Sequence, residues 1–295
     1  MSWLDLQGLI PQLILLLGAT ALLLLGAWFR KPRALLVGGM VTTLLAALAA
    51  GYLTPPVAEI SGLFHSTPYA RFFTIFWCLL GSCSLLVSTR FVVEQRLPGG
   101  EYAGLVLFAV TGMTLLSASS SLIGLFLGLE AFTLAFYVLI AINRRCSLSA
   151  EAGLKYLLLG AIATGFLAFG IALVYAAAGT FHLPEALQAL SVDGAMRAWG
   201  LLGWGLILCA VGFKISLAPF HLWTPDVYQG TPAPVAALLA TGSKGAVVAA
   251  LVGMLIYAGP LWQDLGGLLW TLSALTMLVG ALGALPQTNV KRLLA

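Results

Sequence analysis

Four charged side chains stand inside long apolar stretches of this sequence. They are Glu130, Lys155, Lys214 and Lys244, and runs of Leu, Ala, Gly, Ile and Phe surround each of them. Ionisable residues in such surroundings are rare because an unpaired buried charge is costly, and they commonly mark ion and proton pathways. A carboxylate followed by amines on successive apolar segments therefore indicates a proton relay.

The stretch from Lys214 to Lys244 is the densest part of this pattern. Pro219 lacks a backbone donor and disfavours helical geometry at Ala218, so a helix break is expected beside Lys214. Broken helices at membrane depth line cavities, and their freed backbone groups can interact with ions. His221 follows at once and can exchange protons near neutral pH, which suggests a relay from Lys214; a hydrogen-bonded core histidine is the alternative.

Each of these residues also has a structural interpretation. Glu130 could be a neutral, hydrogen-bonded carboxyl group, and Lys214 could be held in a structural salt bridge. Lys155 lies in the first turns of its segment, where a long side chain can extend to the membrane surface. Glu130 is expected several residues deeper than Lys155, at about 1.5 Å per residue, so a direct pair would depend on the long lysine side chain.

The polar residues after His221 are interpreted as parts of the scaffold. Trp223 and Tyr228 are expected to be interfacial anchors, which is a common role for these residue types in membrane proteins. Asp226 is expected to cap a helix or to be a hydrogen-bond partner within a loop, and not to act as an ion ligand.

Composition places these residues in a membrane protein. Hydrophobic residues make up 61% of the 295 residues, charged residues only 8%, and the mean hydropathy is +1.03. Soluble domains carry far more charge. Because a helix needs roughly 20 apolar residues to span a bilayer, the sequence predicts an all-α, polytopic fold with about nine transmembrane helices. The 14 basic residues form no patch, which argues against binding to nucleic acid.

The apolar runs give approximate limits for these spans. They are 8–29, 34–53, 71–89, 102–118, 121–142, 151–178, 200–228 with the break inside, 234–258 and 264–285. Residues 289–295 predict the start of a tenth helix. The first run lacks a basic segment before it and a small-residue cleavage site, so it is interpreted as a retained span.

The distribution of Lys and Arg predicts the orientation. With the N-terminus outside, nine basic residues outside the spans fall on the inner side and two on the outer side, as the positive-inside rule requires. The inner residues are Arg30, Lys31, Arg33, Arg90, Arg96, Arg144, Arg145, Lys291 and Arg292, and the outer ones are Arg71 and Arg197.

The four cysteines have no metal-like spacing, and no nucleotide loop or haem ligand is evident.

A longer motif carries a family resemblance. Residues 219–234 read PFHLWTPDVYQGTPAP, and LLATGSK leads on to Lys244. This motif resembles that of the antiporter-like membrane subunits of proton-pumping NADH:quinone oxidoreductase (respiratory complex I). The resemblance is greatest to the bacterial subunit-N branch, which corresponds to mitochondrial subunit 2. Mrp-type cation/proton antiporters share the His-x-Trp-x-Pro-Asp core and differ after it. Further matches surround Glu130, Lys155 and Lys214.

The resemblance implies a non-redox subunit of a proton-translocating enzyme. In such subunits the residues matching Glu130 and Lys155 form a charge pair, and the lysine matching Lys214 carries the proton on a broken helix. The lysine matching Lys244 passes it onward, with His221 as a further relay. NADH, FMN, iron–sulfur clusters and quinone are expected on partner subunits and not on this chain. The implied location is the bacterial inner (plasma) membrane, among other membrane subunits of the complex.

The resemblance also divides the chain into three parts. Residues 1–101 would form an N-terminal three-helix region, 102–258 a five-helix antiporter-like repeat with the proton site, and 259–295 the beginning of a second, inverted repeat. That second repeat stops as its second helix begins, so the sequence is expected to be a fragment or to be completed by a companion chain. A Mrp-type secondary antiporter and a structural membrane scaffold are the alternative functions.

Overall fold

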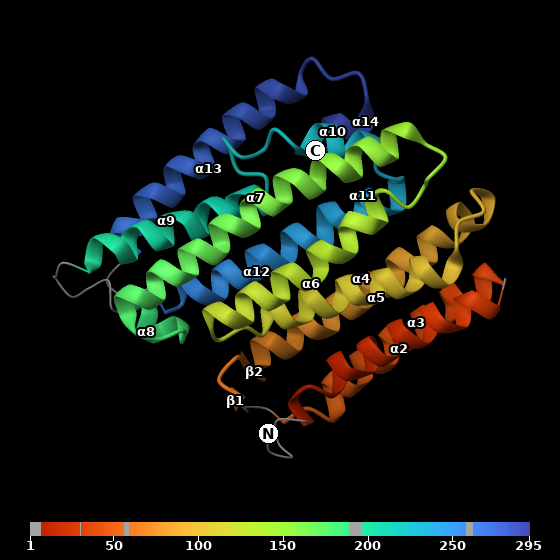
Figure 1. Ribbon diagram of the computed structural model, residues 1–295, viewed down its shortest axis with the longest axis horizontal. Helices are drawn as coiled ribbons and strands as arrows, with labels where there is room; N and C mark the ends of the chain where they lie inside the picture. The colour runs from red at the N-terminus through yellow and green to blue at the C-terminus, as the bar shows by residue number, and fades with distance from the viewer. Residues whose placement is uncertain (1–6, 30, 56–58, 189–195, 258–261) are drawn as a thin grey trace.

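The computed structural model describes residues 7–29, 31–55, 59–188, 196–257 and 262–295. Long helices lie side by side and form a bundle (Figure 1). The long helices are α2 (Ile10–Trp28), α3 (Pro32–Tyr52), α4 (Pro68–Glu94), α5 (Gly99–Ser117), α6 (Leu122–Ile140), α7 (Ser147–Ala178), α9 (Arg197–Lys214), α12 (Lys244–Leu255) and α13 (Trp262–Ala284).

Shorter elements connect and extend these helices. They are α8 (Leu183–Gln188), α10 (Thr224–Gly230), α11 (Ala233–Leu238), α14 (Val290–Leu293) and the π-helical turn η2 (Leu239–Ser243), which joins α11 to α12. Two two-residue strands, β1 (Glu59–Ile60) and β2 (Phe64–His65), form an antiparallel hairpin.

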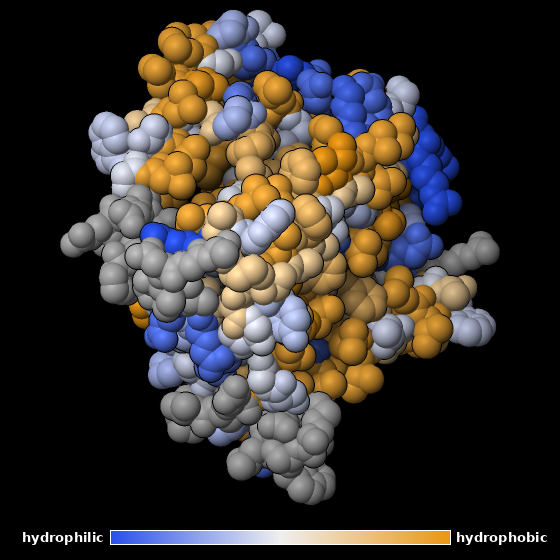
Figure 2. Space-filling view, turned by 60° about the vertical axis from the view of Figure 1, so that its left-hand side comes forward, coloured by the Kyte–Doolittle hydropathy of each residue, from blue (hydrophilic) through white to orange (hydrophobic). Residues whose placement is uncertain are grey.

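The expected polytopic all-α fold is confirmed. Within the described residues, eight helical segments are long and apolar enough to cross a membrane: α2 to α7, the continuous segment Ala233–Leu255, and Gly266–Ala284 of α13. The 18-residue α9, with α10 beyond the break, occupies the place of the expected broken seventh span. Figure 2 shows a broad apolar area on one face, with hydrophilic residues toward its edges. A lipid-facing surface has this character.

Local sequence explains where several spans begin and end. The Thr67 side chain accepts a hydrogen bond from the backbone N–H of Ala70 (3.1 Å) at the start of α4, and Pro68 occupies the first helical position. Ser121 caps α6 in the same way, through Gly124 N–H (3.0 Å). Gly179 ends α7 in the left-handed region, with φ of 71°.

Two spans are longer than the sequence predicted, for a common reason. α4 continues past the expected limit of 89 to Glu94, and its extra turn carries the exposed Arg90–Glu94 ion pair (2.6 Å). α7 starts at Ser147, one turn before the expected limit of 151, and Glu151 and Lys155 form an ion pair in its first turns. Charged residues limit the apolar run but not the helix, because they continue it into the polar region.

The polar connections gather at two opposite ends of the bundle. We call one the hairpin end; it holds β1, β2, residues 118–121 and α8, joined by backbone pairing of Phe64 with Ser119 and of Ser121 with His182. We call the other the basic end; it holds the α4–α5 and α6–α7 connections together with α10 and α14 (Figure 1). Of the basic residues predicted to share one side, Arg30 lies outside the described residues.

Helix α5 forms the centre of the packing. It contacts α2, α3, α4, α6 and α12, and 78% of its candidate span is buried. The approach to α6 is close because Gly128 has no side chain: a Cβ there would lie 2.5 Å from the backbone nitrogen of Leu116. The small residue at Gly128 therefore lets α5 and α6 approach closely.

Candidate functional site

Lys214 is a buried charge with a neutral hydrogen-bond partner. Its side chain is 3% exposed, and its Nζ donates to Thr133 Oγ1 on α6 at 2.8 Å. The aromatic rings of Tyr156 and Phe213 lie 5.7 Å and 6.0 Å from the Nζ, within the range of cation–π attraction. Within the described residues, no carboxylate forms a salt bridge with Lys214.

Glu130 is the carboxylate that acts on Lys214 from a distance. It lies one turn from Thr133 on the same face of α6, and it interacts electrostatically with Lys214. Its Oε1 accepts a hydrogen bond from Thr164 Oγ1 of α7 at 2.7 Å. The face of α6 thus offers the lysine both a hydroxyl acceptor and a nearby negative charge.

The helix break begins earlier than Pro219. α9 ends at Lys214, so this lysine lies at the helix end where the break begins. Ser216 has a positive φ of 61°, the Ala218–Pro219 peptide is cis, and α10 begins only at Thr224. A 2.6 Å hydrogen bond between the hydroxyls of Ser216 and Thr224 joins the two sides of the break.

Lys244 lies on the next helix, at the start of α12, above an aromatic ring. Its Nζ is 5.0 Å from the ring centroid of Tyr228, and 3.5 Å from the backbone oxygen of Ala295. The Tyr228 hydroxyl is buried and has no hydrogen-bond partner among the described residues. Such an orphaned hydroxyl is a natural site for a bound water.

The predicted interfacial role of Trp223 and Tyr228 is wrong. Both are buried, at 3% and 2% exposure, and the Trp223 Nε1 donates to the backbone oxygen of Phe213 at 2.9 Å. Trp223 packs against Tyr156 at 5.1 Å and Tyr228 at 6.4 Å between ring centroids. The break returns the chain into the bundle, so these rings fill the space between Lys214 and Lys244.

Lys155 belongs to a different group of charges, at the basic end. Its Nζ lies 2.8 Å from Glu151 Oε1 and 2.9 Å from Asp226 Oδ2, and its side chain is 41% exposed. Arg292 Nη1 completes the cluster at 2.7 Å from Asp226 Oδ1. Glu130 and Lys155 form no ion pair, which corrects the pairing that the family resemblance implied. The cause is that Glu151 and Asp226 lie within reach of Lys155, whereas Glu130 is held by Thr164.

Asp226 is therefore an ion-pair residue and more than the expected cap. Hydrogen bonds from Lys155 and Arg292 hold the pKa of Asp226 below its ordinary value. Lys291 reinforces the same region because its Nζ donates to the backbone oxygens of Gln229 (2.9 Å) and Thr231 (2.8 Å), at the end of α10. Partial burial lowers the pKa of Lys291.

His221 lies inside the break, beside a hollow of about 380 Å³ between the break, α13 and α14. Its Nδ1 is buried and has no hydrogen-bond partner among the described residues. No hydrogen bond or ion pair described by the structure joins His221 to Lys214, so the predicted relay between them is not a direct contact. A water in the hollow would be the partner that Nδ1 lacks.

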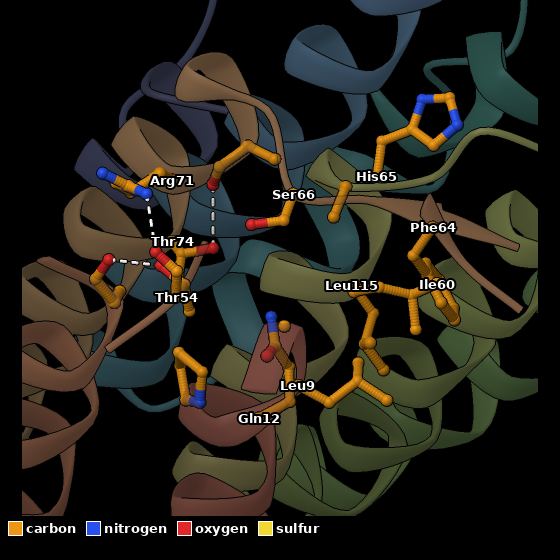
Figure 3. A pocket seen from close by; sticks show the side chains of 15 residues that line it. Leu9, Gln12, Thr54, Ile60, Phe64, His65, Ser66, Arg71, Thr74 and Leu115 are labelled. Atoms are coloured by element: carbon orange, nitrogen blue, oxygen red, sulfur yellow. Dashed lines mark hydrogen bonds between the residues drawn. The ribbon is translucent and has the colours of Figure 1, made fainter. Parts of the chain in front are cut away.

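A second hollow at the hairpin end is too small for a ligand. Figure 3 shows it between Gln12, Ser66 and Arg71, with Arg71 hydrogen-bonded to the backbone oxygen of Thr54 (2.7 Å). Its volume of about 20 Å³ admits about one water, which could bind the unpaired Oε1 of Gln12. Within the described residues, no group of three or more His, Cys, Asp or Glu is arranged to hold a metal ion.

Sequence reasoning missed the hydroxyl groups that support the charges. Thr133 and Tyr137 follow Glu130 at spacings of three and seven residues, which places all three on one helix face. That spacing was a usable signal. The partner Thr164 was not detectable, because nothing in the sequence specifies the rotation of α7 against α6.

The comparisons with known proteins agree on one family. Residues 119–295 match the family described as "NADH:quinone oxidoreductase/Mrp antiporter, TM". The chain is 52% identical, over its full length, to NADH-quinone oxidoreductase subunit N of Syntrophotalea carbinolica, of which it covers 62%.

Solved structures show the same similarity. The chain superposes on a chain of respiratory complex I from Thermus thermophilus with a TM-score of 0.80 and 34% identity, covering 97% of this chain and 60% of that one. A chain of the Mrp complex from Dietzia sp. also gives a TM-score of 0.80, with 99% of this chain and 56% of that one covered. At 21% identity, this structural likeness shows a shared fold alone. The chain thus spans about three-fifths of the length of the relatives that it matches.

Proposed function

The chain belongs to the NADH:quinone oxidoreductase/Mrp antiporter family of membrane proteins, and on this basis we propose that it is a proton-translocating membrane subunit of NADH:quinone oxidoreductase. In this role it moves protons, while NADH oxidation and quinone reduction take place on other subunits. The observation that carries the proposal is the buried Lys214, which is held by a hydroxyl and influenced by a carboxylate that it does not touch.

The geometry suggests how a proton is held and released. Protonated Lys214 donates to Thr133, and the negative charge of Glu130 favours the ammonium form. When Glu130 takes up a proton, that attraction is lost and Lys214 releases its own proton toward Lys244. Water at the orphaned Tyr228 hydroxyl supplies the intermediate step between the two lysines.

The Lys155 cluster has a positioning role in this scheme. Lys155 joins α7 to α10 through Asp226, and Arg292 joins α14 to the same carboxylate. These ion pairs hold the break and its aromatic rings in place between Lys214 and Lys244. His221, beside its hollow, is a candidate exit or entry point for protons at the break.

The setting of the subunit follows from the same family. We place it in the bacterial inner membrane as a multi-pass protein, with the basic end on the cytoplasmic side and the N-terminus outside. Other membrane subunits of the complex are its partners, and FMN, iron–sulfur clusters and the quinone site lie on those other chains. We assign residues 102–258 to the repeat that holds the proton site; the boundary with the segment 259–295 lies outside the described residues.

The direct test is NADH-driven proton pumping in vesicles that contain the assembled complex. Lys214→Met removes the exchangeable amine at nearly constant length, and pumping should fall about tenfold or more at equal assembly. Lys31→Met is the matched control, because Lys31 is an exposed lysine before α3. Pumping that stays at the wild-type level in Lys214→Met would favour a structural scaffold.

A Mrp-type antiporter is the second candidate, because the family description includes both kinds of protein. Such a protein would exchange protons for cations without an electron-transfer partner. Cation-driven proton movement in vesicles that lack NADH would favour this candidate, and its absence alongside NADH-driven pumping would favour the first.

A further inference from the structure

A polar hollow at the basic end approaches Glu130 from the membrane surface. It has a volume of about 530 Å³ and lies between the α4–α5 connection, the first turn of α5 and the end of α6. Its polar lining includes Gln95, Arg96, Glu101, Asn143 and Arg144, and Tyr137 reaches it from α6. Charged and amide side chains at this position admit water, so the hollow is a suitable place for protons to enter.

Two hydroxyl groups connect this hollow to the carboxylate. The Tyr137 hydroxyl lies against α7 and interacts with Thr164, and Thr164 Oγ1 donates to Glu130 Oε1 at 2.7 Å. A threonine hydroxyl carries one hydrogen. Because that hydrogen points to Glu130, the Thr164 oxygen accepts from Tyr137, and the donors run in one direction from the hollow to Glu130.

A glycine makes room for this arrangement. A Cβ at Gly160 of α7 would lie 2.5 Å from the Tyr137 hydroxyl oxygen, closer than a real Cβ tolerates. Gly160 therefore lets the hydroxyl reach across to α7, one turn from Thr164. Gly165 on the same helix has no atom within 4 Å of such a Cβ, so it provides a matched comparison.

We propose that Tyr137 and Thr164 form a proton wire that loads Glu130 from the hollow at the basic end. A hydronium ion in the hollow gives a proton to the Tyr137 oxygen, while the Tyr137 hydrogen passes to Thr164 and the Thr164 hydrogen passes to the Glu130 carboxylate. The hydronium becomes water, each hydroxyl keeps one hydrogen, and Glu130 becomes a neutral carboxylic acid. Rotation of the two hydroxyls then restores the wire.

The inference rests on the proposed function only for the biological role of the wire. The loading of Glu130 itself can be measured without NADH. The experiment is a rapid acidification of the full chain in lipid vesicles, followed by infrared detection of the protonated Glu130 carboxyl band. Glu130→Gln assigns the band by its disappearance. Tyr137→Phe and Thr164→Val each remove one hydroxyl and should slow the appearance of the band about 100-fold, the usual effect of a positioned proton-transfer group.

Three further variants separate the wire from a structural effect. Thr164→Ser keeps the hydroxyl and should load Glu130 at the wild-type rate. Gly160→Ala displaces the Tyr137 hydroxyl and should slow loading, whereas Gly165→Ala should not. Wild-type rates in both Tyr137→Phe and Thr164→Val would overturn the wire. The proposed function would be unaffected by that result, because it is tested separately by NADH-driven pumping.

Discussion

Lys214 and Lys155 are lysines in neighbouring apolar spans, and the structure gives them opposite surroundings. Lys214 is 3% exposed and donates to a neutral threonine, and Glu130 influences it electrostatically without contact. Lys155 has a side chain that is 41% exposed and contacts two carboxylates directly. A lysine in contact with two anions holds its proton, whereas a lysine beside a neutral hydroxyl releases it more readily. The proposed mechanism assigns the two lysines different roles on this basis.

The surroundings of the two lysines differ in depth and in hydrogen-bond partner, although the residue type is the same. In the sequence both lysines stand inside apolar runs, although Lys155 lies near the start of its run. Only the ends of α7 and α9 and the fold of the break separate them: Lys155 reaches Asp226 at the basic end, while Lys214 remains against α6. Substitutions on the Lys214 side and on the Lys155 side should therefore have different effects on pumping and on stability.

The largest effect is expected from Glu130→Gln. The amide keeps the shape and can still accept from Thr164, but it removes the charge that acts on Lys214. NADH-driven pumping in vesicles should fall about 100-fold, because the carboxylate can no longer take up and return a proton. Glu151→Gln, which alters only the Lys155 side, is the control and should retain most pumping. Equal losses of pumping in the two variants would mean that the carboxylate near Lys214 matters no more than the one paired with Lys155.

A smaller effect is expected from Thr133→Val, which removes the hydroxyl next to the Lys214 Nζ without changing the shape of the side chain. Hydrogen bonds to charged groups are worth about 1.5–3 kcal/mol, so pumping should fall about tenfold. Thr133→Ser restores the acceptor and should restore the rate. If valine and serine behave alike, the hydroxyl does not act on Lys214.

Asp226→Asn should affect stability more than transport. Asp226 joins Lys155 to Arg292 in a cluster whose side chains are 30% to 41% exposed, so solvent screening keeps the contribution of these pairs to the unfolding free energy small. Thermal unfolding in detergent should show a lowered midpoint. Glu94→Gln, which breaks the fully exposed Arg90 pair, should leave the midpoint unchanged. An unchanged midpoint in Asp226→Asn would mean that the cluster does not hold α10.

The smallest effect is a dependence of that stability difference on pH. Lys155 and Arg292 depress the pKa of Asp226 in the folded state, so its contribution is present above the unfolded pKa of about 3.9 and is lost as the pH falls through the lower, folded value. The midpoints of wild type and Asp226→Asn should therefore differ at neutral pH and converge in strong acid. A gap that persists in acid would point to packing as its cause.

The sequence predicted the fold more completely than the site. The apolar runs placed the spans to within a few residues, since hydropathy and length decide membrane crossing, and the family expected from residues 219–234 is confirmed. The region of the break was also predicted from Pro219. The exact end of α9 at Lys214 was not, because the residues from Ile215 to Trp223 leave the helix for reasons of tertiary packing.

The pairings within the site could not be read from the chain. Asp226 is 71 residues from Lys155 and 66 from Arg292, and only the packing of α7, α10 and α14 brings them together. The burial of Trp223 and Tyr228 has the same origin, because the break folds back into the bundle. Residue types and helical spacing identified which side chains carry charge, and the relative rotation of the helices decided which of them meet.

In the proposed mechanism, Lys214 exchanges its proton while Lys155 keeps its own. Arginine preserves the positive charge but does not release its proton, so it distinguishes the two roles. The decisive measurement is NADH-driven proton pumping in vesicles with the assembled complex carrying Lys214→Arg or Lys155→Arg, compared at equal assembly. We expect pumping to be lost in Lys214→Arg and largely retained in Lys155→Arg. Wild-type pumping in Lys214→Arg would show that proton transfer does not pass through Lys214.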